Sequence, residues 1–147
     1  MNSRRRRGTT DVKSDSIDRI PINAQEDIVH ARKRGRETAR ELGFGYADQT
    51  RLATAISELA RNTLTHAGSG VCEIGVEQAQ DTGSVVVVVT DSGPGIADVE
   101  AAMRDGFSTS DGLGMGLPGT KRLVDDFHLE SRPGQTKIRV VMTRTLR

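Results

Sequence analysis

The sequence predicts an α+β fold, a two-layer sandwich in which helices cover one face of a mostly antiparallel sheet. Two patterns predict it. Apolar residues alternate with polar ones over residues 71–77 and 137–145, as in half-buried strands, and five consecutive valines fill residues 85–89. Two long segments near the start, residues 24–42 and 48–66, repeat apolar residues at helical spacing. Helices that precede a run of strands favour this class over regular β-α-β alternation.

Residues 16–22 form the first predicted strand. Pro21 indicates an edge position, because proline cannot donate a hydrogen bond to a neighbouring strand. A helix follows it, with Asn23 and Glu26 spaced as in a capping box. Gly43 is the expected end of that helix.

The second predicted helix covers residues 48–66, and four of its residues recur on one side and form its buried stripe: Leu52, Ile56, Leu59 and Thr63. Residues 71–77 and 84–90 follow as a predicted hairpin, and the run of valines indicates a central strand in its second arm. Cys72 alternates with Ile74, which favours a core residue over a nucleophile.

The last third of the chain combines loops, short helices and two further strands. A short helix is predicted over residues 99–104, and a glycine-rich stretch leads into a helix that extends to about Phe127. Residues 128–131 and 137–145 are then expected to pair as antiparallel strands. The sequence therefore describes one domain, residues 16–147, behind a basic tail of residues 1–15.

Composition narrows the classes of function. The 147 residues carry a formal net charge of +1, which gives no overall field that selects nucleic acid or a membrane, and tryptophan is absent. Four consecutive arginines, Arg4 to Arg7, are expected to form a solvated, disordered tail rather than a nucleic-acid-binding arm. We expect a cytoplasmic protein without an internal disulfide, because we find one cysteine, no signal peptide and no membrane span.

The glycine-rich loop is a candidate phosphate site. Gly112, Gly114 and Gly116 leave room for backbone N–H groups to close on an anion, and the helix that starts at Leu117 adds unpaired donors and a positive dipole end. The order Gly119-Thr120-Lys121 does not match the Gly-Lys-Ser/Thr ending of a P-loop. On its own, the loop is consistent with an ordinary turn before a helix.

Asp91 follows the valine-rich strand and precedes Gly93 and Gly95. A carboxylate in this place accepts a hydrogen bond from an exocyclic amine, while the glycines let a flat ring lie against the backbone. The alternative is a turn aspartate after a strand.

Glu58 and Asn62 lie one turn apart on the same side of the second helix, at the rim of its buried stripe. An amide oxygen there suits a hard cation such as Mg²⁺, and a carboxylate one turn earlier suits a base or an orienting group. The alternative for this pair is a solvated helix edge.

Together these motifs resemble the GHKL ATPase superfamily, which includes histidine kinases, DNA gyrase B, mismatch-repair ATPases and anti-sigma serine kinases. Residues 56–62 resemble its N box, residues 91–95 its first glycine box and residues 112–117 its second. Residues 57–62 and 106–123 further resemble the RsbT-type switch kinases. The resemblance covers about residues 16–145 and implies the two-layer fold of that superfamily, known as the Bergerat fold.

The resemblance implies ATP and Mg²⁺ as cofactors and a role for each motif residue. Asp91 is expected to bind the adenine amino group, with Gly93 and Gly95 close to the base. Asn62 is expected to bind Mg²⁺. Glu58 is expected to orient or deprotonate the attacking serine hydroxyl.

The remaining implied roles concern the phosphates and the rim of the adenine site. Gly112, Gly114 and Gly116 are expected to face the phosphates, with the backbone of Leu117 at the helix start. Thr136 is expected to support the adenine through water. Arg61 is expected to reach a phosphate or an acidic partner, or to be solvated.

As a function, the resemblance implies a serine/threonine protein kinase of a partner-switching pathway, such as those that control stress responses. Its implied substrate is a STAS-domain antagonist protein, and its release is expected to activate a PP2C-type phosphatase. The short lid between Asp91 and Gly112 leaves an open side for a protein substrate. Two alternatives stay open: an RsbW-type anti-sigma factor that binds a sigma factor directly, and a nucleotide-gated binding module with little kinase activity.

Overall fold

Five strands and three helices make up the described part of the chain. The structure is a computed structural model, and it describes residues 17–96, 103 and 116–146. The tail and most of the helix predicted over residues 99–104 lie outside these residues. In chain order the elements are β1 (Asp18–Ile22), α1 (Gln25–Leu42), α2 (Tyr46–Ala67), β2 (Gly70–Gln78), β3 (Thr82–Asp91), α4 (Gly116–Leu123), β4 (Asp126–Arg132) and β5 (Gln135–Thr145).

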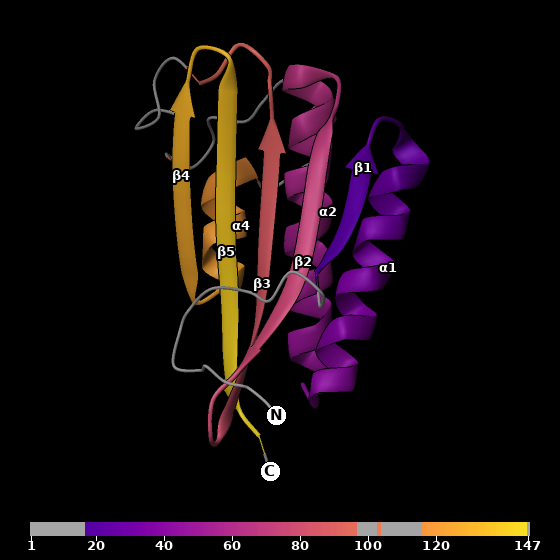
Figure 1. Cartoon of the computed structure of the whole chain (residues 1–147), viewed down its shortest axis with the longest axis vertical. Helices are drawn as coiled ribbons and strands as arrows, with labels where there is room; N and C mark the ends of the chain where they lie inside the picture. The colour runs from indigo at the N-terminus through magenta and orange to yellow at the C-terminus, as the bar shows by residue number, and fades with distance from the viewer. Residues whose placement is uncertain (1–16, 97–102, 104–115, 147) are drawn as a thin grey trace, which may run out of the picture.

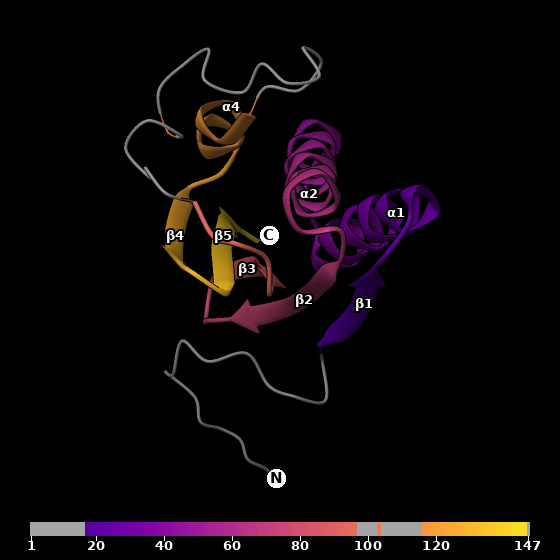
Figure 2. The ribbon, with the colours of Figure 1, turned by 90° about the horizontal axis from the view of Figure 1, so that it is seen from above.

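The five strands form one antiparallel sheet in the order β1-β2-β3-β5-β4 (Figure 1). Seen from above, α1, α2 and α4 all lie on the same side of this sheet (Figure 2). The predicted α+β class, the hairpin of β2 and β3 and the central place of the valine-rich strand are therefore confirmed. Pro21 lies on β1 at the edge of the sheet, as its missing N–H predicts.

The core lies between the sheet and α2. Every second residue of β3 faces the helices, and on this face Val85, Val87 and Val89 are buried. The predicted stripe of α2 is buried against them, and each buried aliphatic side chain contributes about 1.5–3 kcal/mol. Cys72 is fully buried in the same cluster, and burial raises the pKa of its thiol to about 12, so it is a core residue and no nucleophile.

Helix α1 begins one residue later than the predicted capping box requires. Ala24 is its N-cap, and the carboxylate of Asp27 accepts hydrogen bonds from the backbone N–H groups of Asn23 (2.8 Å) and Ala24 (3.0 Å). Asp27 therefore takes the role expected of Glu26, which is exposed. Gly43 ends the helix in the left-handed conformation, as predicted. No helix in the described ranges is long and apolar enough to cross a membrane.

Helix α4 is shorter than predicted. It ends at Leu123, and β4 begins at Asp126, so Phe127 lies on a strand opposite Val140 and not on the helix. Asp125 explains the end of the helix, because its carboxylate accepts the backbone N–H of Thr143 on β5 at 2.7 Å. That contact ties the start of β4 to β5 and leaves no further turn for α4.

An ion-pair network closes the end of the domain where α2 begins. Asp48 on α2 receives two hydrogen bonds from the guanidinium of Arg144 on β5, at 2.8 and 3.0 Å, and one from Arg51 at 2.8 Å. Arg144 also pairs with Asp125 at 2.8 Å. The hydrogen bonds from Arg144, with its positive charge, hold the pKa of Asp48 below its usual range. The network thus joins α2, β5 and the segment after α4.

Replacing Asp48 with asparagine should lower the free energy of unfolding by about 1–2 kcal/mol at neutral pH. Because the folded-state pKa of Asp48 is lowered, its contribution is fully present above the ordinary aspartate pKa and is lost as the pH falls below about 4. Urea unfolding across this pH range measures the difference between the two proteins.

Asp126→Asn is the matched control, since Asp126 is exposed on β4 and has no ion pair with any described residue. If the difference in free energy of unfolding between wild type and Asp48→Asn stays constant down to acid pH, the role assigned to the Asp48 carboxylate in this network is wrong.

Candidate functional site

The outer rim of α2 carries Glu58 and Asn62, as predicted. Leu59 and Thr63 between and beside them are buried in the core, so the two polar residues lie at the border between buried and exposed helix surface. The Glu58 side chain is 16% exposed. No hydrogen bond joins the amide of Asn62 to any described residue, so its oxygen is available to an external partner.

Glu58 is paired with Arg61, one turn along the same helix. The guanidinium of Arg61 donates a hydrogen bond to the Glu58 carboxylate at 2.8 Å, and the Arg61 side chain is 36% exposed. The sequence alone left Arg61 undecided between a phosphate, a partner and solvent. In this structure Arg61 pairs with Glu58, the residue predicted to act as the base.

Asp91 is the last residue of β3 and one of the few buried acidic residues of the described chain. Its carboxylate accepts the backbone N–H of Gly93 at 2.9 Å, which folds the chain into a tight turn directly after the strand. Thr136 on β5 lies opposite Asp91 in the sheet and is also buried. The two predicted adenine-site residues are therefore neighbours on the helix-facing side of the sheet.

Both glycines after Asp91 lie where a side chain would collide with a neighbour. A Cβ on Gly93 would lie 2.6 Å from the Cβ of Ala67, the last residue of α2. Gly95 has a φ of 87°, which favours glycine, and a Cβ there would collide with the carbonyl oxygen of Arg132 on β4. The turn after β3 is thus pressed between α2 and β4.

Ser131 is a site residue that sequence reasoning missed. Its hydroxyl accepts the backbone N–H of Ile96 at 2.7 Å and lies 2.7 Å from the hydroxyl of Thr136. It therefore links the turn after Asp91 to the β4–β5 hairpin. A signal was available, because Phe127, Leu129 and Ser131 share the inward face of β4, and Ser131 is the polar member of that series.

The start of α4 is the part of the predicted phosphate side that the structure describes. Gly116 begins the helix with a φ of 71°, and the Leu117 side chain is buried in the core. Leu117 is in the first turn, where a backbone N–H has no partner within the helix. Helix α4 packs on α2 (Figure 2). Gly112 and Gly114 lie outside the described residues.

The arrangement suits a ligand with a flat polar ring at one end and anionic groups at the other. Gly93 lies against Ala67, and Asn62 precedes Ala67 by five residues, or about 7 Å along the helix. Glu58 lies about 6 Å further toward the start of α2. In the described part of the chain no group of three acidic, histidine or cysteine side chains could hold a metal ion by itself. A hard cation bound through Asn62 would need further oxygen ligands from phosphates.

Comparison with known proteins gives independent evidence of ancestry. The family profile of histidine kinase-, DNA gyrase B- and HSP90-like ATPases matches residues 47–146. The serine/threonine-protein kinase RsbT of Bacillus subtilis is 52% identical over 125 residues, which cover 83% of this chain and 92% of that protein. An anti-sigma F factor of a Thermoanaerobacter species is 32% identical over 88 residues, or 57% of this chain and 62% of that factor.

Among solved structures, the RsbU and RsbW domains of a Mycobacterium tuberculosis protein superpose with a TM-score of 0.60. Sequence identity is 19%, so this likeness concerns the fold; it covers 88% of this chain and 34% of the other. The order of motifs, the two-layer architecture and the match to RsbT along most of its length agree. The chain therefore belongs to the histidine kinase-, DNA gyrase B- and HSP90-like ATPase family, and within it to the RsbT-type serine/threonine protein kinases.

Proposed function

We propose that this protein transfers the γ-phosphoryl group of ATP to a serine or threonine of a STAS-domain antagonist, within a partner-switching pathway. The observation that carries the proposal is the placement of Glu58 and Asn62 on one rim of α2, the helix that packs on α4 and whose last residue, Ala67, lies against the turn after Asp91. Similarity to a serine/threonine-protein kinase supports the reaction type. Similarity to anti-sigma factors supports a regulatory protein as the substrate.

The adenine lies against the turn after β3. Asp91 receives the exocyclic amine on the carboxylate oxygen that is free of Gly93, and the lack of side chains at Gly93 and Gly95 lets the turn pack on Ala67 and Arg132 and so holds this carboxylate in place. Thr136 and Ser131 form the other border of the adenine site. Their hydroxyls share a hydrogen bond, and the Ser131 hydroxyl also accepts the backbone N–H of Ile96. A buried carboxylate in such a place selects an amino purine because a keto group would repel it.

The phosphates lie between the glycine-rich loop and the rim of α2. Gly112, Gly114 and Gly116, with the N–H of Leu117, supply backbone donors, and Asn62 supplies an amide oxygen for Mg²⁺. When bound, Mg²⁺ neutralises charge on the phosphate oxygens. Asn62 fits this role because its amide has no partner among the described residues.

Glu58 holds the attacking hydroxyl. In the transfer, the bond between the γ-phosphorus and the β–γ bridging oxygen breaks, and a bond from the acceptor oxygen to that phosphorus forms. The hydroxyl proton passes to the Glu58 carboxylate, and ADP leaves with the bridging oxygen. Arg61 now pairs with Glu58, and it becomes available to an anionic phosphate oxygen when that pair opens.

Partner switching requires that the kinase bind two proteins in turn, the STAS-domain antagonist and a PP2C-type phosphatase. Binding of the unphosphorylated antagonist sequesters the kinase, and phosphorylation weakens that complex because a phosphate adds about two negative charges. The released kinase then engages and activates a PP2C-type phosphatase.

A direct anti-sigma function is the second candidate, and the similarity to anti-sigma F factors favours it. In that case the chain binds a sigma factor stoichiometrically as well as phosphorylating its antagonist. A pull-down with purified sigma factors separates the two functions: retention of a sigma factor at a one-to-one ratio favours this candidate over phosphatase activation.

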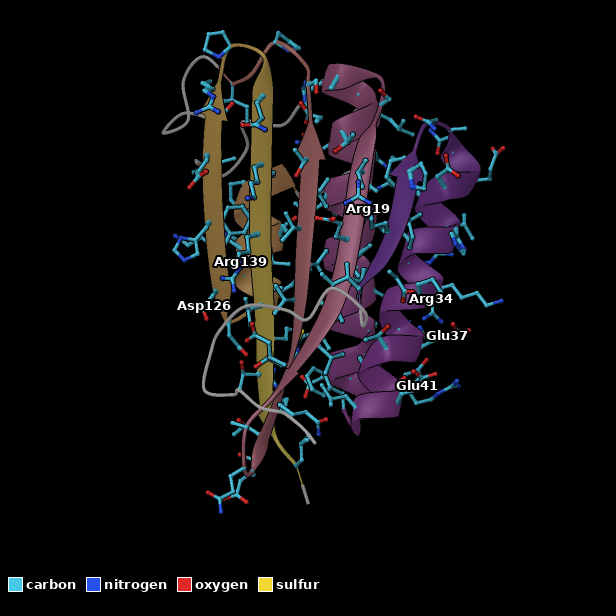
Figure 3. All side chains as sticks on the ribbon, in the orientation of Figure 1. Arg19, Arg34, Glu37, Glu41, Asp126 and Arg139 are labelled. Atoms are coloured by element: carbon cyan, nitrogen blue, oxygen red, sulfur yellow. The ribbon has the colours of Figure 1, made fainter. Side chains whose placement is uncertain are left out.

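Transfer of radiolabel from ATP to a purified STAS protein should depend on Glu58. Glu58→Gln keeps the size of the side chain but cannot accept the proton, so the rate should fall about 100-fold or more while ATP affinity stays within about twofold. Glu41→Gln is the matched control, since Glu41 is exposed on α1 (Figure 3). Absence of label on every candidate STAS protein, with ATP still bound, would exclude the proposed substrate class. Unchanged partner switching in cells that carry Glu58→Gln would favour the nucleotide-gated binding module.

Asn62→Ala should remove most of the Mg²⁺ dependence of ATP binding. We expect about a tenfold loss of affinity in the presence of Mg²⁺ and little change in its absence, because only the cation contact is lost. Calorimetry with and without Mg²⁺ measures this. Thr65→Ala, an exposed change on the same helix, serves as the control. An undiminished response to Mg²⁺ would refute the assignment of Asn62.

Gly95→Ala should weaken ATP binding more than Gly134→Ala does. Both glycines have a left-handed φ, 87° and 91°, so both changes carry the same backbone cost of about 1–2 kcal/mol. At Gly95 the new Cβ also collides with Arg132. At Gly134 no atom lies within 4 Å of the new Cβ. We expect at least about a tenfold difference in ATP dissociation constant between the two variants. Equal effects would mean that the turn after β3 does not border the nucleotide.

A further inference from the structure

The outer surface of α1 separates its charges into two sides. On the side next to β1, Arg34 pairs with Asp18 at 2.7 Å and with Glu37 one turn along. Arg34, Glu37 and Glu41 follow one another along α1 (Figure 3). These hydrogen bonds to Asp18 and Glu37 raise the pKa of Arg34, so the charges on this side satisfy one another.

The side of α1 next to α2 is basic. Val29, Lys33, Arg36 and Arg40 recur at intervals of four, three and four residues, which places them in one row along the helix. We call this row, together with Tyr46 at the start of α2, the basic stripe. Lys33 and Arg40 are exposed and form no ion pair with any described residue.

Arg36 ties the basic stripe to the first turns of α2. Its guanidinium donates a hydrogen bond to the hydroxyl of Thr50 at 3.2 Å and lies 5.5 Å from the centre of the Tyr46 ring. The cation–π contact holds the ring in place, although Tyr46 is 77% exposed. Val29 is 51% exposed, and these two are the large apolar side chains that the described chain leaves open to solvent. Both side chains are therefore accessible to a binding partner.

The basic stripe leads toward Glu58. Helices α1 and α2 are antiparallel, and the contact of Arg36 with Thr50 sets their register. Val29 precedes Arg36 by seven residues, which corresponds to about 10 Å along α1. The same distance along α2, measured from Thr50, reaches the level of Glu58. Arg61 follows Thr50 by eleven residues, or about three turns, and so lies on the same side of α2 as the residue that contacts α1. The Glu58–Arg61 pair therefore lies near the end of the stripe that Val29 forms.

We propose that the basic stripe is the docking surface for the acceptor protein, through an acidic helix or strand with an apolar residue at each end. This proposal rests on the proposed function. Tyrosine and arginine are the residues that recur at the energetic centres of protein interfaces. The stripe is one helix face wide, and Glu26 and Glu37 border it, so it suits a narrow acidic element of a protein rather than the broad charge of nucleic acid or a membrane.

Reversal of two unpaired charges tests the proposal. In the full chain carrying Lys33→Glu and Arg40→Glu, the KM for a STAS acceptor phosphorylated by the wild type should rise at least about tenfold. The maximal rate and the KM for ATP should stay unchanged, since neither residue lies at the nucleotide site. The KM for the acceptor should also lose most of its dependence on salt. Tyr46→Ala should raise the same KM without changing its salt dependence.

Lys137→Glu with Arg139→Glu is the matched control. It changes the net charge by the same amount on the face of the sheet opposite the helices (Figure 3). Replacement of acidic residues on the acceptor by lysine should restore the lowered affinity of the stripe variant, which a merely misfolded variant would not allow.

The outcomes separate the two proposals. Transfer with an unchanged acceptor KM in the stripe variant, or an equal rise in the control, overturns the docking surface and leaves the kinase function standing. If the stripe variant loses binding to duplex DNA or to anionic vesicles while its KM for the acceptor is unchanged, the stripe binds another ligand and the docking proposal is also overturned. No transfer by the wild type to any STAS protein overturns the proposed function and the docking surface together.

Discussion

Burial of α2 against the centre of the sheet determines where the functional residues can lie. Leu52, Ile56 and Leu59 are almost completely buried among the valines of β3, which fixes the rotation of the helix about its own axis. A helix fixed in rotation has its rim fixed as well. The core thus sets the direction of Glu58 and Asn62, since the hydrogen bond that Glu58 accepts comes from Arg61 on the same helix and not from another element.

A second constraint acts at the far end of α2, where three segments meet with no space for side chains. The turn after β3 touches Ala67 at Gly93 and Arg132 at Gly95, and the hydroxyl of Ser131 joins that turn to β5. Backbone packed this closely cannot move independently of the sheet. A nucleotide that lies on this turn is positioned by the same core that positions Glu58, so the two ends of the site keep a constant separation.

The sequence predicted what depends on repetition and failed where single contacts decide. The succession of helices and strands along the chain and the stripe of α2 follow from apolar periodicity, and Asp91 and the glycines follow from ordered motifs. The exact caps do not: Asp27 instead of Glu26 accepts the first N–H groups of α1, and Asp125 ends α4 before Phe127 by pairing with β5. Those outcomes depend on atoms that are distant in sequence.

Charge on the surface was the least predictable property. Counting charges gives a balanced α1, with five lysines and arginines against four acidic residues, and nothing in that balance indicates a docking surface. The distinction appears only when Arg34 is seen to be neutralised by Asp18 on β1, whereas Arg36 contacts Tyr46 on α2.

The position of Arg61 connects these surfaces physically. It lies on the side of α2 that contacts α1, near the Val29 end of the basic stripe, and it is also the hydrogen-bond donor of Glu58. An acidic segment that binds along the stripe competes for Arg61, and so does an anionic phosphate oxygen. Either contact would remove the hydrogen bond that the Glu58 carboxylate accepts from Arg61. In the proposed mechanism, the Glu58 carboxylate is thus open to the acceptor hydroxyl when the acceptor and the nucleotide are in place, and its hydrogen bond with Arg61 holds it at other times.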